Sequence, residues 1–183
     1  MCQVSKKTFL KKQTQLLQQI PTHWSNAKEY FSLPSIIKPP KELIQLLDIK
    51  TIETIVIHHH RLLQKSEIAY LYPVDEDIFM EGVKKVTYFI IQVLGGGEIY
   101  TTTYGEPHMC KTHRPFAIDA NARIVWLKLY AQTLKELHFP KEYVESFWNW
   151  LESFSLRMVN KGSLNMYTNR LFFDEIKPKL EWN

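Results

Sequence analysis

The sequence predicts an all-α protein built around one packed helical domain. Apolar residues make up 45% of the 183 residues, and glycine occurs only 6 times. This composition favours a helical globule over a disordered or all-β chain. Apolar residues recur at helical spacing in several long runs, whereas strand-like alternation is nowhere sustained. The length suits a single domain with a core of its own.

A proline-rich stretch near residue 40 divides the chain. Before it, residues 6–20 carry apolar side chains at mostly helical spacing and stop at Pro21, which predicts a short amphipathic helix. Residues 33–42, LPSIIKPPKE, hold three prolines and are typical of a linker. We therefore expect an N-terminal extension over 1–41, a main domain over 42–161 and a C-terminal tail over 162–183.

The first two helices expected in the main domain lie on either side of residue 70. The stretch TIETIVIHHHRLL, residues 51–63, has a helical apolar stripe that includes His59. Because consecutive helix residues are about 100° apart, the three histidines cannot all face the core. A second helix spans about residues 78–94 and ends at Gly95 in a GGG run. A loop with few periodic signals is expected from there to about Thr112.

Two further helices complete the main domain. The stretch DANARIVWLKLYAQTLKEL, residues 119–137, opens with Asp119 as the expected N-cap and carries an apolar stripe that includes Trp126 and Tyr130. Pro140 starts the fourth helix, whose apolar stripe continues to Met158, before Gly162.

Charge and cysteine content indicate the compartment and the class of partner. Of the net charge of +4, residues 1–42 contribute seven lysines against two glutamates, so the rest of the chain is close to neutral. This argues against nucleic-acid binding by the folded part. No run approaches the roughly 18 apolar residues of a membrane-spanning helix, and the opening lacks a secretory pattern. With only Cys2 and Cys110, we expect a reduced, cytoplasmic protein.

The histidines are the candidate metal ligands. His108 and His113 are five residues apart, which on a helix separates them by about 140°, so they do not form the i, i+4 pair of a zinc helix. The chain also lacks HExxH, paired CxxC, GxSxG and phosphate-loop motifs. A histidine beside an aromatic-rich helix suits an iron centre in apolar surroundings. The alternative is a hydrogen-bonded structural histidine, and the residues alone leave both open.

The stretch from Tyr88 to Leu127, YFIIQVLGGGEIYTTTYGEPHMCKTHRPFAIDANARIVWL, resembles the central segment of group II truncated haemoglobins, the two-over-two helical globins of bacteria and plants. Their pattern is a helix ending in GGP, then Y, GHP, RHxPFxI and a tryptophan at a fixed distance. The matching residues lie at the family spacing without a gap: Gly95, Gly96, Tyr100, Gly105, Pro107, His113, Pro115, Phe116, Ile118 and Trp126. Glu106 departs from the GHP pattern. The resemblance covers roughly residues 42–160.

The resemblance implies a bound haem b with His113 as the iron ligand, and His108 as a neighbour that does not bind the iron. Trp126 corresponds to the indole that donates a hydrogen bond to the bound ligand. Tyr72 takes the position whose ring packs on the haem and whose hydroxyl reaches the ligand. His59 stands where relatives have their main distal tyrosine, so it is expected to donate to the ligand or to bind the iron itself. The structural alternative for His59 is a packed histidine bonded to Tyr72.

The remaining residues of the implied haem pocket are expected from the same comparison. Gly82 and Val86 correspond to the two positions that gate and line the ligand side; Gly82 leaves entry open, and Val86 cannot donate a hydrogen bond. Lys111 and Arg114 flank His113 and are expected near the haem propionates, with solvated surface as the equal alternative. The other expected pocket residues are Phe89, Ile90, Tyr100, Met109, Phe116 and Ile118.

These features imply a protein that binds O2 reversibly, and also NO, CO or sulfide, in oxygen transport or redox detoxification. One alternative is a haem peroxidase or NO dioxygenase served by an external reductase, since the chain contains no flavin or nicotinamide domain. A second alternative is a haem-free helical interaction module. The sequence leaves the oligomeric state open.

Overall fold

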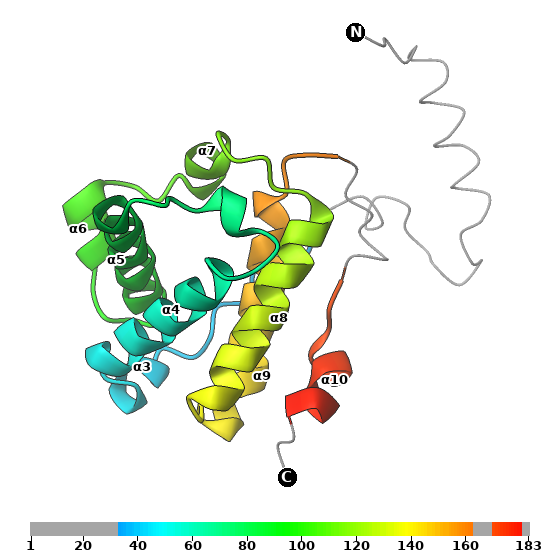
Figure 1. The fold of residues 1–183 in the computed structure, drawn as a ribbon. Helices are drawn as coiled ribbons and strands as arrows, with labels where there is room; N and C mark the ends of the chain where they lie inside the picture. Colours follow the sequence, from blue (N-terminus) through cyan, green and yellow to red (C-terminus); the bar gives the residue numbers. More distant parts are fainter. Residues whose placement is uncertain (1–32, 163–169, 181–183) are drawn as a thin grey trace, which may run out of the picture. The chain divides into compact units, whose positions relative to one another are not determined.

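The computed structural model describes residues 33–162 and 170–180, and the helix expected over 6–20 lies outside them. The described part is helical, with no strands in these two ranges. The long helices are α4 (Ile49–Leu63), α5 (Glu76–Val93), α8 (Ala120–Glu136) and α9 (Lys141–Ser155). Figure 1 shows α4 and α5 on one side and α8 and α9 on the other. The all-α, two-over-two arrangement predicted from the sequence is confirmed.

Side-chain caps fix where three of these helices begin. The carboxylates of Asp48, Asp75 and Asp119 accept hydrogen bonds from the main-chain N–H groups of Thr51, Ile78 and Ala122. Each bond satisfies a donor that the first turn of a helix leaves unpaired. The N-cap expected at Asp119 is therefore confirmed. At the other end of α5, Gly95 adopts a φ of +96°, as expected for a glycine that ends a helix.

The region between α5 and α8 differs from the expected loop. It contains two short helices, α6 (Ile99–Tyr104) and α7 (Met109–His113). The side-chain amide of Gln92 ties α6 to α5, since its Nε2 donates to the Thr101 hydroxyl at 2.8 Å and its Oε1 accepts from the Thr101 N–H at 2.9 Å. Helices of five or six residues are too short to show a periodic pattern, so contacts with other elements define them.

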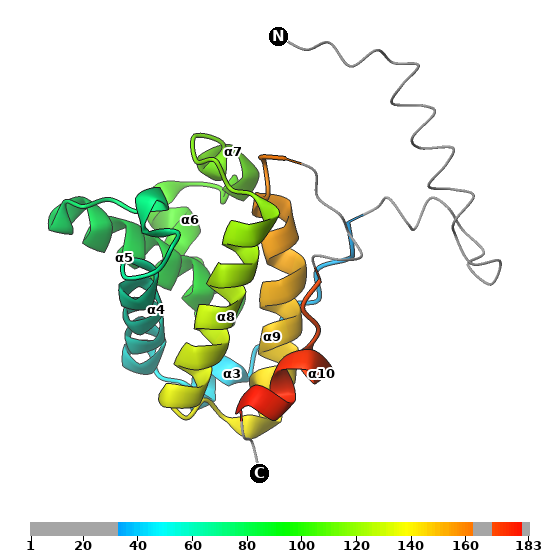
Figure 2. The same ribbon diagram turned by 45° about the vertical axis from the view of Figure 1, so that its right-hand side comes forward.

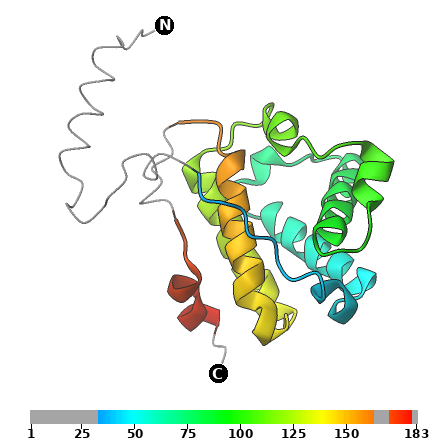
Figure 3. The ribbon, with the colours of Figure 1, turned by 180° about the vertical axis from the view of Figure 1, so that it is seen from behind.

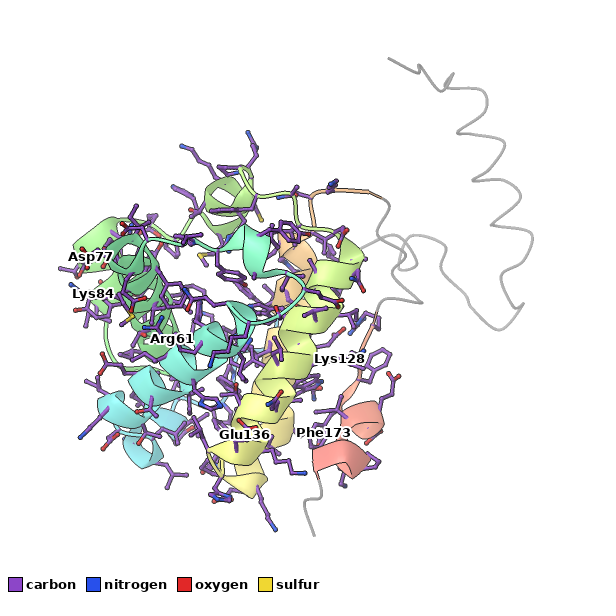
Figure 4. All side chains as sticks on the ribbon, in the orientation of Figure 1. Arg61, Asp77, Lys84, Lys128, Glu136 and Phe173 are labelled. Carbon is purple, nitrogen blue, oxygen red and sulfur yellow. The ribbon has the colours of Figure 1, made fainter. Side chains whose placement is uncertain are left out.

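Several short elements accompany the long helices. They are α3 (Leu43–Leu46), the 3-10 turns η1 (Ala69–Leu71), η2 (Leu156–Met158) and η3 (Lys177–Leu180), and α10 (Phe173–Ile176). The indole Nε1 of Trp148 on α9 donates to the Leu171 carbonyl at 2.9 Å. Phe173 lies between α10 and the α8 and α9 pair (Figure 4). Figure 3 shows residues 33–42 crossing α9 on the way to α3.

The main apolar core lies between the two helix pairs. It combines buried residues of α4, α5, α8 and α9 with Leu171, Phe173 and Ile176 from the C-terminal segment. The division at residues 41 and 161 stays a prediction. Among the described residues, no helix has the length and apolar character needed to cross a bilayer.

Candidate functional site

A cavity of about 690 Å³ opens between the two helix pairs. Residues of α4, α5, α7, α8 and α9 form its walls; Figures 1 and 2 show how these helices are arranged. Most of its lining is apolar or aromatic, a composition typical of cofactor sites. The lining residues used below are His60, Tyr72, Gly82, Val86, Phe89, Ile90, Met109, His113, Phe116, Ile118, Arg123, Trp126 and Tyr130.

His113 lies in the cavity wall with one ring nitrogen available. Its Nδ1 is 2.8 Å from the carbonyl oxygen of Met109, one turn earlier in α7. Because a carbonyl oxygen can only accept, Nδ1 carries a proton, so Nε2 is the ring nitrogen that can offer a lone pair to a metal. A metal-binding histidine commonly donates its other N–H in this way, which fixes the ring orientation and makes the ligand nitrogen more basic.

His60 from α4 reaches the cavity in the same tautomeric state. Its Nδ1 donates to the Val56 carbonyl at 2.8 Å, so its Nε2 also keeps a lone pair. The residue is buried, and burial lowers the pKa of its imidazole to about 4. The ring is therefore neutral near pH 7, and it can accept a hydrogen bond from a molecule in the cavity.

His59 is not among the residues that line the cavity. It is fully buried, as its place on the apolar stripe predicts. Its Nε2 donates to the Trp126 carbonyl at 3.1 Å, and its ring packs on Tyr130 at a centroid distance of 3.6 Å. Burial and then the neighbouring His60 lower its pKa well below the ordinary value. The two histidines are one helical step apart, so α4 directs one to α8 and the other to the cavity.

Three aromatic side chains add hydrogen-bond donors to the cavity wall. Tyr72, Trp126 and Tyr130 line it, and Trp126 and Tyr130 meet at a centroid distance of 4.6 Å. Burial raises the pKa of both tyrosine hydroxyls, so both stay protonated and can donate. Tyr130 was expected only as a core residue. Its place four residues after Trp126, on the same face of α8, was the signal that could have identified it.

The other expected pocket residues divide into two groups. Those that line the cavity are Gly82, Val86, Phe89, Ile90, Met109, Phe116 and Ile118. Tyr100 is instead buried behind Phe89, with the two rings 5.8 Å apart. Lys111 and Arg114 are exposed, and they do not contribute to the lining.

A buried ion-pair network lies against the same cavity. Arg123 lines the cavity, and its guanidinium contacts Glu152 Oε1 at 2.7 Å and the Ser155 hydroxyl at 2.9 Å. Arg170, from the C-terminal segment, contacts both oxygens of the Glu152 carboxylate at 2.7 Å. Burial by itself would raise the pKa of Glu152, but the bonds from Arg170 and Arg123 hold it below the ordinary value. The carboxylate therefore stays ionised between the two arginines.

The residues present fit a haem. The cavity is apolar over most of its wall, and the Nδ1 bond of His113 to Met109 leaves the Nε2 of the imidazole as the nitrogen that can bind iron. His60, Tyr72, Trp126 and Tyr130 supply polar groups for a small ligand. The apolar stripe had singled out His59 for this role, but both histidines are buried on α4 and it is His60 that lines the cavity.

Comparisons with known proteins identify the family. The model of the bacterial-like globin family matches residues 48–160. The group 2 truncated hemoglobin YjbI of Bacillus subtilis (strain 168) is 29% identical over 91 residues, which are 50% of this chain and 69% of that protein.

Solved structures agree. Phosphate-bound Hell's gate globin IV has a TM-score of 0.78 and 35% identity, over 85% of this chain and 97% of that one. The truncated oxygen-avid haemoglobin from Bacillus subtilis has a TM-score of 0.60 and 23% identity, over 64% of this chain and 98% of that one. The chain therefore belongs to the bacterial-like globin family and has the fold of the group II truncated haemoglobins.

Proposed function

We propose that this protein holds a haem b through His113 and binds O2 reversibly on it. The observation that carries the proposal is the state of His113, whose Nδ1 donates to Met109 and whose Nε2 is left free at the wall of an apolar cavity. Neither cysteine belongs to a CxxCH motif, which favours a noncovalent haem over a covalently attached one. The iron supplies the site at which a diatomic gas binds.

The polar groups of the cavity divide into donors and an acceptor. A ligand such as O2, NO or CO that gains partial negative charge accepts hydrogen bonds, and Tyr72, Trp126 and Tyr130 can donate them. His60 presents a lone pair and instead suits a ligand that carries a proton, such as water or hydrogen sulfide. In this proposal His59, expected from the sequence to act on the ligand, supports the donors from behind.

Oxygen binding is favoured over the redox alternatives by the polar groups of the cavity. An arginine, Arg123, lines the cavity, but its guanidinium already donates hydrogen bonds to the Glu152 carboxylate and the Ser155 hydroxyl. Its charge is therefore already compensated before a peroxide could bind. The Bacillus subtilis haemoglobin with this fold is oxygen-avid, which supports O2 as the ligand. NO dioxygenation would also need an electron donor. The cytoplasmic location expected from the sequence remains part of this proposal.

Haem titration of the purified full chain tests the proposal. We expect wild type to give ferric and ferrous globin absorption spectra and a stable complex with O2, whereas His113→Ala should lose stable haem. His108→Ala is the matched control, because His108 is exposed and lies one residue before α7. If wild type takes up no haem, the proposal is wrong, and the haem-free interaction module replaces it. Rapid turnover of peroxide without a stable O2 complex would favour the peroxidase instead.

A further inference from the structure

The helix that carries His113 is too short to hold its own position. It contains five residues, Met109–His113, and a helix of this length is marginal without tertiary contacts. Figure 2 shows α7 near the end of α9, and the elements in contact there are α7 and η2. The position of the imidazole therefore depends on bonds between α7 and the chain that follows α9.

Asn160, two residues after η2, makes the most direct of these bonds. Its side-chain Nδ2 donates to the carbonyl oxygen of His113 itself at 2.9 Å. Its Oδ1 accepts from the main-chain N–H of Ile118 at 3.1 Å, and its own N–H donates to the Ile118 carbonyl at 2.9 Å. The orientation of the amide follows from its partners, since a carbonyl accepts and an N–H donates. One side chain thus joins the two ends of residues 113–118.

Two further contacts involve residues of α7. The Cys110 thiol lies 3.6 Å from the Arg157 carbonyl, and the imidazole of His113 is bonded to the Met109 carbonyl. The Met109 bond sets the rotation of the ring, while the Asn160 bond sets the backbone from which the ring projects. The bond from Asn160 crosses 47 residues of sequence to reach its partner.

We propose that Asn160 is a positioning residue for His113, and that its amide sets the orientation in which the imidazole Nε2 faces the haem. This inference rests on the proposed function. Without the amide donor, the His113 carbonyl keeps one bond, from the Phe116 N–H at 3.1 Å, and the end of α7 gains freedom. An imidazole held less firmly gives a less uniform iron bond and releases haem faster.

The substitution Asn160→Asp isolates the bond to His113. A carboxylate can still accept from Ile118, but it places an oxygen against the His113 carbonyl in place of the donor. The readouts are the iron–histidine stretching band of the ferrous, ligand-free protein in resonance Raman and the rate of haem transfer to an excess of colourless acceptor globin. We expect the band to shift or broaden and haem loss to become about three- to tenfold faster, the range for one lost hydrogen bond.

Asn149→Asp is the matched control, because Asn149 is an exposed asparagine on α9 and the substitution makes the same change of charge. It should leave both readouts at wild-type values. Asn160→Ala, which removes both side-chain bonds, should change the band at least as much as Asn160→Asp. Unfolding of each variant is followed by circular dichroism, so that a general loss of stability is seen separately.

The inference is overturned if Asn160→Asp and Asn160→Ala both keep the wild-type band position and width, even if they unfold more easily. If the wild type nevertheless forms a stable haem complex, unchanged bands in both variants leave the proposed function intact. A wild type that takes up no haem removes the proposed function itself, so the two failures are distinguishable.

Discussion

His59 Nε2 donates to the main-chain carbonyl of Trp126 at 3.1 Å, and the His59 ring packs on Tyr130 at 3.6 Å between centroids. Both partners line the cavity, whereas His59 does not. The family resemblance places His59 beside the ligand. In the structure His59 instead packs behind Trp126 and Tyr130, the residues that line the cavity. We therefore expect substitution of His59 to change mainly the stability of the fold, and substitution of cavity-lining residues to change ligand binding.

His59→Leu should lower stability and leave ligand binding nearly unchanged. The substitution removes one buried hydrogen bond, but it also removes the unpaired buried Nδ1. We therefore expect a net loss of about 1 kcal/mol in the free energy of unfolding, measured in urea. The O2 dissociation rate should stay within about threefold of wild type. A far larger increase would mean that His59 touches the ligand directly.

Tyr72→Phe should affect O2 dissociation more strongly than His60→Leu. The tyrosine can donate to a partly charged ligand, and a bond of this kind contributes about 1.5 to 3 kcal/mol. Its loss should accelerate dissociation by roughly tenfold or more, as measured by stopped flow. The free nitrogen of His60, Nε2, can only accept a hydrogen bond, and bound O2 has no proton to donate. His60→Leu should therefore have the smaller effect. The reverse order of the two rates would show that His60 carries the proton on Nε2.

His60 should make the haem-free protein less stable at acid pH. Its pKa is about 4 in the folded chain, against 6.5 for the free side chain. Between these values the unfolded chain binds a proton that the folded chain does not, so stability is complete above 6.5 and is lost as the pH falls toward 4. The loss amounts to about 3 kcal/mol. Urea unfolding of His60→Leu should show a shallower fall over this range than wild type, and equal slopes would contradict the assignment.

Glu152→Gln should be among the most destabilising substitutions in the chain. It leaves Arg123 buried beside Arg170 without the carboxylate that both guanidinium groups contact. Removing one partner of a buried ion pair typically costs about 3 to 5 kcal/mol. Arg170→Gln should cost less, because its side chain is 19% exposed. Thermal unfolding followed by circular dichroism compares the two, and equal losses would contradict a role for burial.

Gly82→Ala should stabilise the protein. Gly82 is an exposed residue inside α5, and an added Cβ has no neighbour within 4 Å. Alanine is about 1 kcal/mol more favourable than glycine in a helix. Gly96→Ala is the contrasting variant, since its Cβ would collide with the Ile91 side chain. The denaturant concentration at the midpoint of unfolding should rise for Gly82→Ala and fall for Gly96→Ala. A lower midpoint for Gly82→Ala would contradict the prediction and indicate that the added methyl group meets a neighbour that is absent from this structure.

The sequence by itself determined the long helices and, through its resemblance to a known family, singled out His113 as the candidate ligand. Apolar periodicity over four or five turns identifies a helix without any knowledge of what packs against it. The Asp119 cap and the Gly95 stop depend on residues close to them in the chain. The residues around His113 that match the family pattern, HRPFAI, likewise belong to one short segment. These features are local, so the amino-acid order is enough to predict them.

Only the tertiary structure decided which of the two α4 histidines faces the cavity and which contacts hold the segment that carries His113. Apolar periodicity identifies the buried side of α4. It does not show which buried residue faces the cavity, because His59 and His60 are adjacent on that side: His59 contacts α8, and His60 lines the cavity. The five residues of α7 are held by Asn160 from 47 residues away. Glu152 likewise acquires Arg170 from the C-terminal segment. Contacts between residues this far apart in the chain have no local pattern, because they form only when the helices pack.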